Sequence, residues 1–218
     1  VINMVLQIGI GFMIAVGLNS TVLKKTSRIY KTLLMLPWAM PAYISILLWR
    51  VGMFNTEFGI LNKCLTLLGF NKVDFLGNNV IAFCSCLALN LWMALPFMIS
   101  TIDGALQSVD SSLYESATLD GAGFWVSMRD ITIPAIKPII APAAVMTTFI
   151  TFKQFDIVYL LTQQRGYMTG ANFNTVITYA HQNAFVSNNY GLPSAVSMLL
   201  FVIIILFSLI TNRSLREE

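Results

Sequence analysis

One stretch of the chain has the residue pattern most suited to contact with another protein. Ser112 and Glu115 have the spacing of a capping box, which predicts the start of a helix. Gly121 interrupts that helix, because glycine permits a sharp bend. A second short helix is predicted over 124–131, and Pro134 then ends it. We expect two short helices with a kink that project as a docking surface. A plain helical hairpin joining two apolar segments is the alternative.

Three polar residues sit inside an apolar run: Lys153, Gln154 and Asp156. Charges deep in a bilayer usually face a bundle interior or a water-filled cavity. Lys153 and Asp156 have a spacing that allows pairing on a helix, so a structural role and a functional one both stay open. His181 has no Cys, Asp or Glu cluster around it, and we interpret it as an external-loop residue rather than a metal ligand. The sequence contains no phosphate-binding loop and no nucleophile–base arrangement.

The composition excludes several classes of protein. Hydrophobic residues make up 56% of the 218 residues and charged residues only 11%, whereas soluble domains average about 25% charged residues. The chain has too few polar groups to cover the surface of a soluble domain. An ordinary cytosolic enzyme, a disordered tail and a nucleic-acid-binding protein are therefore excluded.

The apolar residues are arranged in segments long enough to cross a membrane as helices. We predict an all-α integral membrane protein, a polytopic helical bundle forming a single domain over 1–218, with a helix-turn-helix loop at 102–137. The link 52–78 contains a further helical pattern that Gly69 can end, and that helix lies either at the membrane interface or packed in the loop. The five predicted spans are 1–20, 30–51, 79–100, 138–161 and 192–211.

The placement of Lys and Arg predicts the orientation of these spans. If the spans alternate, eight basic residues fall on one side and four on the other, and the richer side is expected to be cytoplasmic. Val1 already lies in an apolar run, so we expect the chain to be a fragment preceded by at least one more helix, with six or more spans in full. The richer side holds Lys24, Lys25, Arg28, Lys31, Arg129, Lys137, Arg213 and Arg216; the other side holds Arg50, Lys63, Lys72 and Arg165.

The loop at 102–137 resembles the coupling loop, or EAA motif, of ABC importer membrane subunits. Ser116 and Ile133 are mild departures from that motif. Segments 36–41, 54–62 and 155–162 extend the resemblance to the MalF-type subunits of maltose/maltodextrin importers. The resemblance implies that the ATPase-coupling residues are Glu115, Ser116, Ala117, Asp120, Gly121, Ile131 and Pro134.

The resemblance also implies a set of partners and a cellular location. Such a permease sits in the bacterial cell membrane as a multi-pass protein and imports sugars. It pairs with a second, MalG-type permease subunit, an ATPase dimer and an extracellular sugar-binding protein, and it contacts no nucleic acid. No cofactor binds to the permease itself, because ATP and Mg belong to the partner ATPase. The chain is accordingly expected not to be an enzyme.

A substrate path is likewise implied by the resemblance. Thr151 and Gln154 align with two asparagines of the family's sugar site, and Thr147 lies one turn before Thr151. The family's other sugar-contacting stretch aligns with span three, where an aromatic ring can stack on a sugar; plain helix packing is the alternative there. That stretch comprises Met93, Ala94 and Phe97.

Three other functions stay open at this point. The first is an ABC permease for a different carbohydrate or another small solute. The second is an ion-coupled secondary transporter in which Lys153 and Asp156 form the coupled pair. The third is a membrane scaffold or sensor subunit without transport. The docking motif favours the ABC permease over a secondary transporter, which would need no such motif. The polar residues deep in span four argue against a scaffold or sensor.

Overall fold

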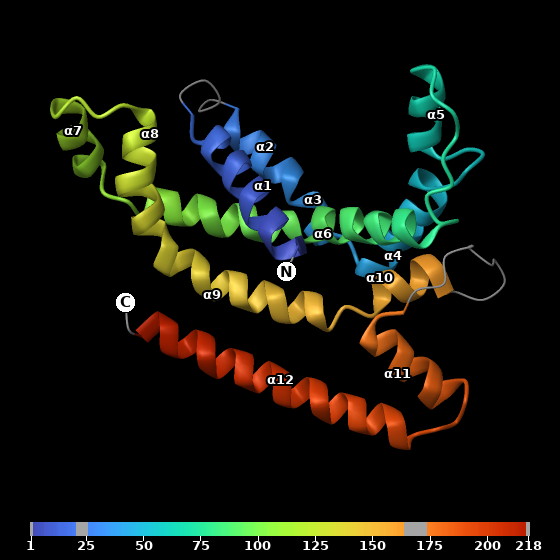
Figure 1. Ribbon diagram of the computed structural model, residues 1–218. Helices are drawn as coiled ribbons and strands as arrows, with labels where there is room; N and C mark the ends of the chain where they lie inside the picture. The colour runs from blue at the N-terminus through green and yellow to red at the C-terminus, as the bar shows by residue number, and fades with distance from the viewer. Residues whose placement is uncertain (1, 21–25, 164–173, 217–218) are drawn as a thin grey trace. The chain divides into compact units, whose positions relative to one another are not determined.

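The computed structural model describes residues 2–20, 26–163 and 174–216, and the described residues are helical with no strand (Figure 1). Lys24, Lys25 and Arg165, which contribute to the charge argument, lie outside the described residues. The chain divides into two compact units, and each unit collects segments that are distant in the sequence. Unit 1 comprises Val1–Trp38, Ala94–Phe149 and Leu209–Glu218; unit 2 comprises Ala39–Met93 and Ile150–Ser208.

Unit 1 is built around the second half of the long helix α6 (Asn79–Gln107). Its core consists of Ala15, Met98 and Ile102, with Phe12 and Ile140 packed against them. The helices that supply these residues differ widely in length, from a single turn to a full membrane-spanning length. Besides α6, unit 1 contains α1 (Ile2–Leu18), α2 (Ser27–Leu34), α3 (Leu36–Ala39), α7 (Ser111–Leu119), α8 (Phe124–Ser127), the π-helical turn η2 (Met128–Thr132) and most of α9 (Ile133–Phe152).

Unit 2 surrounds the first half of α6 with shorter helices. Its core is larger and includes Ile46, Phe54, Leu89, Ile157 and Leu161. The predicted helix in the link 52–78 is confirmed as α5. The elements of unit 2 besides α6 are α4 (Ala42–Leu48), η1 (Trp49–Met53), α5 (Ile60–Leu67), α10 (Asp156–Val158), η3 (Tyr159–Gln163), α11 (Val176–Phe185) and most of α12 (Gly191–Arg216).

The apolar helices match the predicted spans in part. By length and composition, two helices of the described chain can cross a membrane, Asn79–Gln107 and Phe124–Phe152. A third candidate is broken into Ser27–Ala39 and Ala42–Met53, and two further apolar helices, α1 and 191–206, are shorter. Many large apolar side chains on these helices are exposed, as expected where lipid rather than water covers the surface. The chain is a membrane protein, and the number of five spans stays a prediction.

The helix that carries predicted span four, 138–161, differs from that prediction at both ends, and the span itself stays a prediction. The helix begins at Phe124 rather than at 138, because the chain continues through η2 into α9 without a break. It ends at Phe152, and residues 153–155 are not helical. Lys153 and Gln154 therefore lie in a break between α9 and α10 and not on a helix surface.

Candidate functional site

The coupling segment, residues 108–132, begins with a capped helix. The Asp110 carboxylate accepts a hydrogen bond from the Ser112 backbone N–H at 2.9 Å and caps α7. That bond favours the charged form and lowers the pKa of Asp110 below its ordinary value. The predicted capping box of Ser112 and Glu115 is wrong, because Ser112 already lies inside the helix and Glu115 is two residues past the N3 position, which Leu113 occupies. Asp110 competes successfully for the cap because a carboxylate is among the best N-cap acceptors.

The predicted bend at Gly121 is confirmed. Gly121 has φ +78°, in the left-handed region. Its N–H donates to the Thr118 carbonyl at 3.1 Å, and the Ala122 N–H donates to the Ala117 carbonyl at 2.8 Å. This pair of bonds is a Schellman motif, which ends a helix and satisfies its last carbonyls. The direction in which the chain leaves α7 is thus set by backbone hydrogen bonds and by one glycine.

The second helix of the coupling segment starts where the sequence predicts, at Phe124. Its predicted end at Pro134 is wrong, since the helix widens into η2 at Met128–Thr132 and then continues as α9. Proline has no N–H to donate to the preceding turn, and a π-helical turn directly before Pro134 accommodates that missing bond. The coupling segment is consequently continuous with a helix of membrane-spanning length.

One side-chain contact fixes the two helices of the segment to each other. The Tyr114 hydroxyl of α7 and the Thr132 hydroxyl of η2 are 2.9 Å apart and share a hydrogen bond. Thr132 is buried, and its hydroxyl also donates to the Ser127 carbonyl at 3.3 Å. The sequence did not predict this contact, because the spacing of Tyr114 and Thr132 gives no indication that their side chains meet. This hydrogen bond links α7 to η2 across the bend at Gly121.

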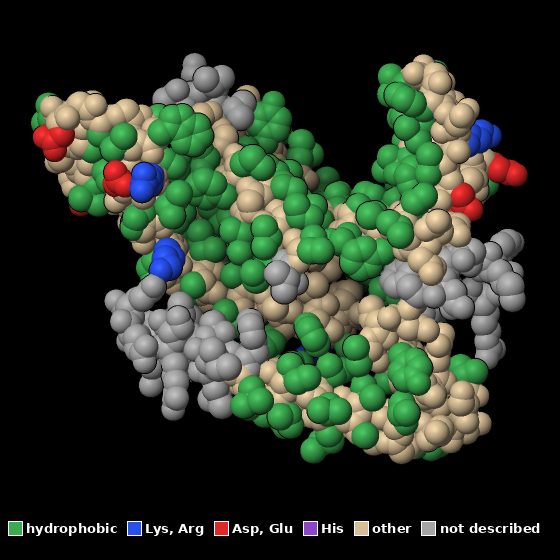
Figure 2. All heavy atoms as spheres, in the orientation of Figure 1, with side chains coloured by type: hydrophobic (Ala, Val, Ile, Leu, Met, Phe, Trp, Pro, Cys, Tyr) green, Lys and Arg blue, Asp and Glu red, His purple; other side chains and the backbone are tan. Residues whose placement is uncertain are grey.

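The exposed face of α7 and α8 is apolar and acidic, and Arg129 in the following turn η2 is an exposed cation beside Asp130. Leu119 and Trp125 are 90% and 80% exposed, and no Lys or Arg occurs between Gly104 and Met128. Figure 2 shows acidic and hydrophobic side chains together over α7 and α8. An exposed apolar patch of this kind marks an interaction surface. Of the sequence-predicted coupling residues, Glu115, Ser116, Asp120, Gly121 and Pro134 are exposed, and Ala117 and Ile131 are half-buried.

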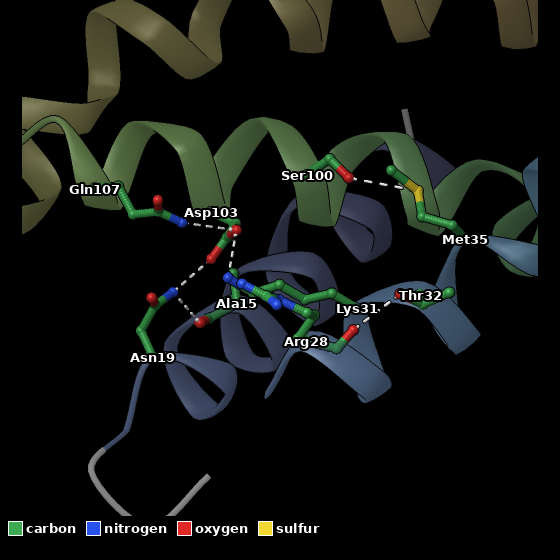
Figure 3. A network of polar contacts seen from close by, with 9 residues as sticks. All are labelled: Ala15, Asn19, Arg28, Lys31, Thr32, Met35, Ser100, Asp103 and Gln107. Atoms are coloured by element: carbon green, nitrogen blue, oxygen red, sulfur yellow. Dashed lines mark hydrogen bonds and ion pairs between the residues drawn. The ribbon is translucent and has the colours of Figure 1, made fainter. Parts of the chain in front are cut away.

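A polar cluster lies within unit 1 near the base of the coupling segment (Figure 3). The Asp103 carboxylate of α6 accepts hydrogen bonds from the Asn19 amide at 2.7 Å and from the Gln107 amide at 2.9 Å. It also forms an ion pair with Lys31 of α2 at 2.7 Å. A single carboxylate thus joins the end of α1, the middle of α2 and the last turns of α6. The sequence indicated that this carboxylate is special, because Asp103 is the one charged residue of α6.

The predicted substrate-path residues fall into two groups. In unit 1, Thr147 is buried, Ala94 is half-buried and Phe97 is exposed. Met93, Thr151 and Gln154 belong to unit 2 and are half-buried. Thr147 and Thr151 share α9, whereas Gln154 lies beyond its end. Each group has polar or aromatic side chains that can contact a solute, and their assignment to one path stays a prediction.

At two further polar positions the structure differs from what the sequence suggested. Lys153 and Asp156 form no ion pair in the described chain, because the break at 153–155 removes the helical spacing on which the pairing depended. His181 lies on α11 rather than in a loop, and its ring contacts those of Phe155, Tyr159 and Phe185 at centroid distances of 4.8, 5.1 and 4.9 Å. The ring of His181 is therefore packed among aromatic rings, while its buried Nδ1 has no hydrogen-bond partner within the described chain. No group of His, Cys, Asp or Glu able to hold a metal occurs among the described residues.

The fold and the coupling segment together define a class of protein. Apolar helices of membrane-spanning length, joined by an exposed two-helix segment, describe a subunit of a membrane protein. Residues 7–216 match the model of the family described as "Binding-protein-dependent transport system inner membrane component", and the chain belongs to that family. It is therefore a transport component and not an enzyme.

Individual relatives agree with this assignment. The chain is 32% identical to the trehalose/maltose transport system permease protein MalF of Thermococcus litoralis, over 96% of this chain and 68% of the relative. It is also 32% identical to the galactooligosaccharides transport system permease protein GanP of Bacillus subtilis, over 98% of this chain but 52% of the relative. A bacterial ABC transporter that imports alginate has the same fold, with a TM-score of 0.82 at 24% identity over 99% of this chain and 77% of the other.

Proposed function

We propose that this chain is the membrane-spanning permease subunit of an ATP-driven importer of sugars in the maltose/maltodextrin class. Its helices form the translocation path, and a separate ATPase supplies the energy. The coupling segment is the observation that carries the proposal, because it is linked across its bend by a hydrogen bond, capped at both helix ends and exposed on an apolar and acidic face. Such a segment can transmit a displacement of the docked ATPase to the membrane helices.

The same segment supports an ATPase as the docking partner. Helix α7 and its caps carry Asp110, Glu115 and Asp120 and no basic residue, so a basic surface on the partner is electrostatically complementary to α7. Because α6 and the helix 124–152 leave the segment directly, a displacement at the tip moves both. Closure of the ATPase dimer on ATP would thus reach the transport path through two helices. ATP and Mg bind to the ATPase in this account.

The remaining partners follow from the family. We infer an extracellular sugar-binding protein that delivers the sugar, a MalG-type second permease subunit that completes the path, and the bilayer around the apolar helices. In this arrangement the chain is a multi-pass protein of the bacterial cell membrane, with the coupling segment inside.

This orientation is tested by cysteine labelling. An impermeant thiol reagent applied to intact cells should label native Cys64, which is exposed in α5, and not a Thr26→Cys variant that lacks the native cysteines. The opposite pattern would invert the topology and remove the ATPase from reach of the coupling segment.

The sugar class is tested by transport. The complete complex, reconstituted in proteoliposomes with its binding protein, should take up maltose and maltotriose only when ATP is present on the ATPase side. Phe97→Ala should raise the half-saturating sugar concentration through lost stacking. Uptake that depends on an ion gradient and not on ATP would refute the proposal.

A second carbohydrate class has specific support. The galactooligosaccharide permease is as similar to this chain, at 32% identity, as the trehalose/maltose permease is. Moreover, the predicted path presents Thr151 and Gln154 where the maltose family has asparagines, so its hydrogen-bonding geometry differs. Galactooligosaccharides therefore belong in the uptake panel, and preference for them over maltodextrins would select this second class.

A further inference from the structure

Two amide side chains of α1 are buried without hydrogen-bond partners. Asn3 and Gln7 lie one helical turn apart and are 5% and 0% exposed. Neither the nitrogen nor the oxygen of either amide has a partner within the described chain. The rest of the buried face of α1 is Gly11, Ala15 and Leu18. The two amides therefore interrupt an otherwise apolar packing surface.

An unpaired buried amide has a free-energy cost, because it has given up water without gaining another partner. Most buried polar groups in proteins are paired. Even the exposed amide of Asn19, just past the end of the same helix, is paired: it donates to the Ala15 carbonyl at 2.9 Å and to the Asp103 carboxylate at 2.7 Å. A position where a protein retains the free-energy cost of an unpaired buried group is expected to be a functional site.

The two amides belong to a helix that packs on the elements of the predicted substrate path in unit 1. A Cβ built on Gly11 would lie 3.1 Å from Cγ of Met98 in α6. The Thr148 hydroxyl of α9 donates to the sulfur of Met4 at 2.9 Å. The same turn of α9 carries Thr147, which is 5% exposed. Thus α1 contacts both helices of unit 1 on which substrate-path residues are predicted.

We propose that Asn3 and Gln7 are part of the sugar path and form hydrogen bonds with sugar hydroxyls during transport. This inference rests on the proposed function. An amide offers two N–H donors and a carbonyl acceptor, which complements a hydroxyl that both donates and accepts. A neutral amide carries no net charge that would neutralise an ionic solute. Both side chains are enclosed in the described state, so the helices must part for a solute to reach them, as alternating access requires.

The first test is the accessibility of position 7 in the complete transporter. Cys64, Cys84 and Cys86 are free thiols, so they are first replaced by serine. A Gln7→Cys variant should then react with a small cationic methanethiosulfonate reagent in either the nucleotide-free or the ATP-bound state, and maltotriose should slow the reaction. The matched control is Ala15→Cys, on the same buried face, which should stay unlabelled in both states.

The outcomes of this test separate the inference from the proposed function. If Gln7→Cys is as unreactive as Ala15→Cys in both states, the inference is overturned, whatever sugar the wild type transports. If Gln7→Cys reacts but no carbohydrate of the panel slows it, the position lines a path and the sugar assignment fails. Reaction with protection by maltotriose supports both.

The second test compares stability with transport. Gln7→Met removes the unpaired amide at nearly constant length, so it should raise the melting temperature of the complex. It should also raise the half-saturating maltotriose concentration about two- to tenfold, the range for one lost hydrogen bond. Asn19→Leu is the control, and it should lower the melting temperature because that amide is paired. A higher melting temperature with unchanged half-saturation would mean that the amide has only a folding cost or holds an internal water, and would overturn the inference.

Discussion

Replacement of Gly121 by alanine isolates the contribution of a single backbone conformation to energy coupling. Gly121 has φ +78°, and a Cβ built there meets nothing within 4 Å. The alanine side chain therefore has no steric clash. The free-energy cost of Gly121→Ala is that of holding an L-residue in the left-handed region, about 1–2 kcal/mol. A change of that size alters the ratio of bent to unbent segments about five- to thirtyfold. Gly121→Ala should therefore weaken docking of the ATPase and lower sugar-stimulated ATP hydrolysis, while the membrane helices still fold.

The chain offers a matched control for this substitution. Gly69 ends α5 with φ +84°, also with nothing within 4 Å of its Cβ. The Phe70 N–H donates to the Leu65 carbonyl at 2.9 Å, so the helix ends there in the same way. Gly69→Ala should have a similar local cost and leave ATPase docking intact. Gly121→Asn should lie between wild type and Gly121→Ala, since asparagine tolerates this conformation better than alanine does.

The assay is co-purification of the ATPase with the tagged permease, followed by sugar-stimulated ATP hydrolysis in proteoliposomes. Equal docking and stimulation for wild type and Gly121→Ala would refute the reasoning, because the bend would then be immaterial to coupling. Equal losses for Gly69→Ala and Gly121→Ala would also refute it, since the effect would be general destabilisation.

Three further outcomes are expected. Asp103→Asn should lower the stability of the detergent-solubilised chain by about 1 kcal/mol in thermal unfolding, because it removes the charge from a half-buried cluster. Asp130→Asn, in an exposed pair at 3.9 Å, should change stability little. Gln154→Leu should reduce apparent sugar affinity by about 1–3 kcal/mol with normal assembly, and unchanged uptake kinetics would remove Gln154 from the path. The pKa of Asp110 in the folded chain is lowered, so its stabilisation of α7 is present above the ordinary aspartate pKa and is lost as the pH falls through the folded pKa. A spin label on a Leu119→Cys variant should therefore become more mobile on acidification. This response should be absent when Asp110→Asn is added.

Local chemistry made part of the coupling segment predictable. A glycine directly after a helical pattern predicts a left-handed helix end, and both Gly69 and Gly121 have positive φ. The start of the second helix at Phe124 and the start of α6 at Asn79 also follow from where the polar links end. These features depend only on residues a few positions away in the sequence, so a single sequence is enough to predict them.

Features that depend on distant or competing groups were not predictable in the same way. Asp110 takes the cap that spacing assigned to Ser112 and Glu115, because two plausible acceptors compete. The apolar run across 138–161 gives no sign that the helix stops at Phe152. The bond between Asn19 and Asp103 joins residues 84 positions apart. Its partners are brought together by packing of α1 on α6, which no periodicity reveals.

The central claim is that the coupling segment is the docking surface for an ATPase, and site-specific photo-crosslinking tests it most directly. A benzophenone amino acid replaces Trp125, which is 80% exposed, or Trp38, which is 66% exposed on a predicted span. After irradiation of native membranes, crosslinked chains are identified by mass spectrometry. Our account predicts that position 125 captures a subunit with an ATP-binding phosphate loop and that position 38 does not. Capture of no such subunit at position 125, in membranes where the complex imports sugar, would contradict it.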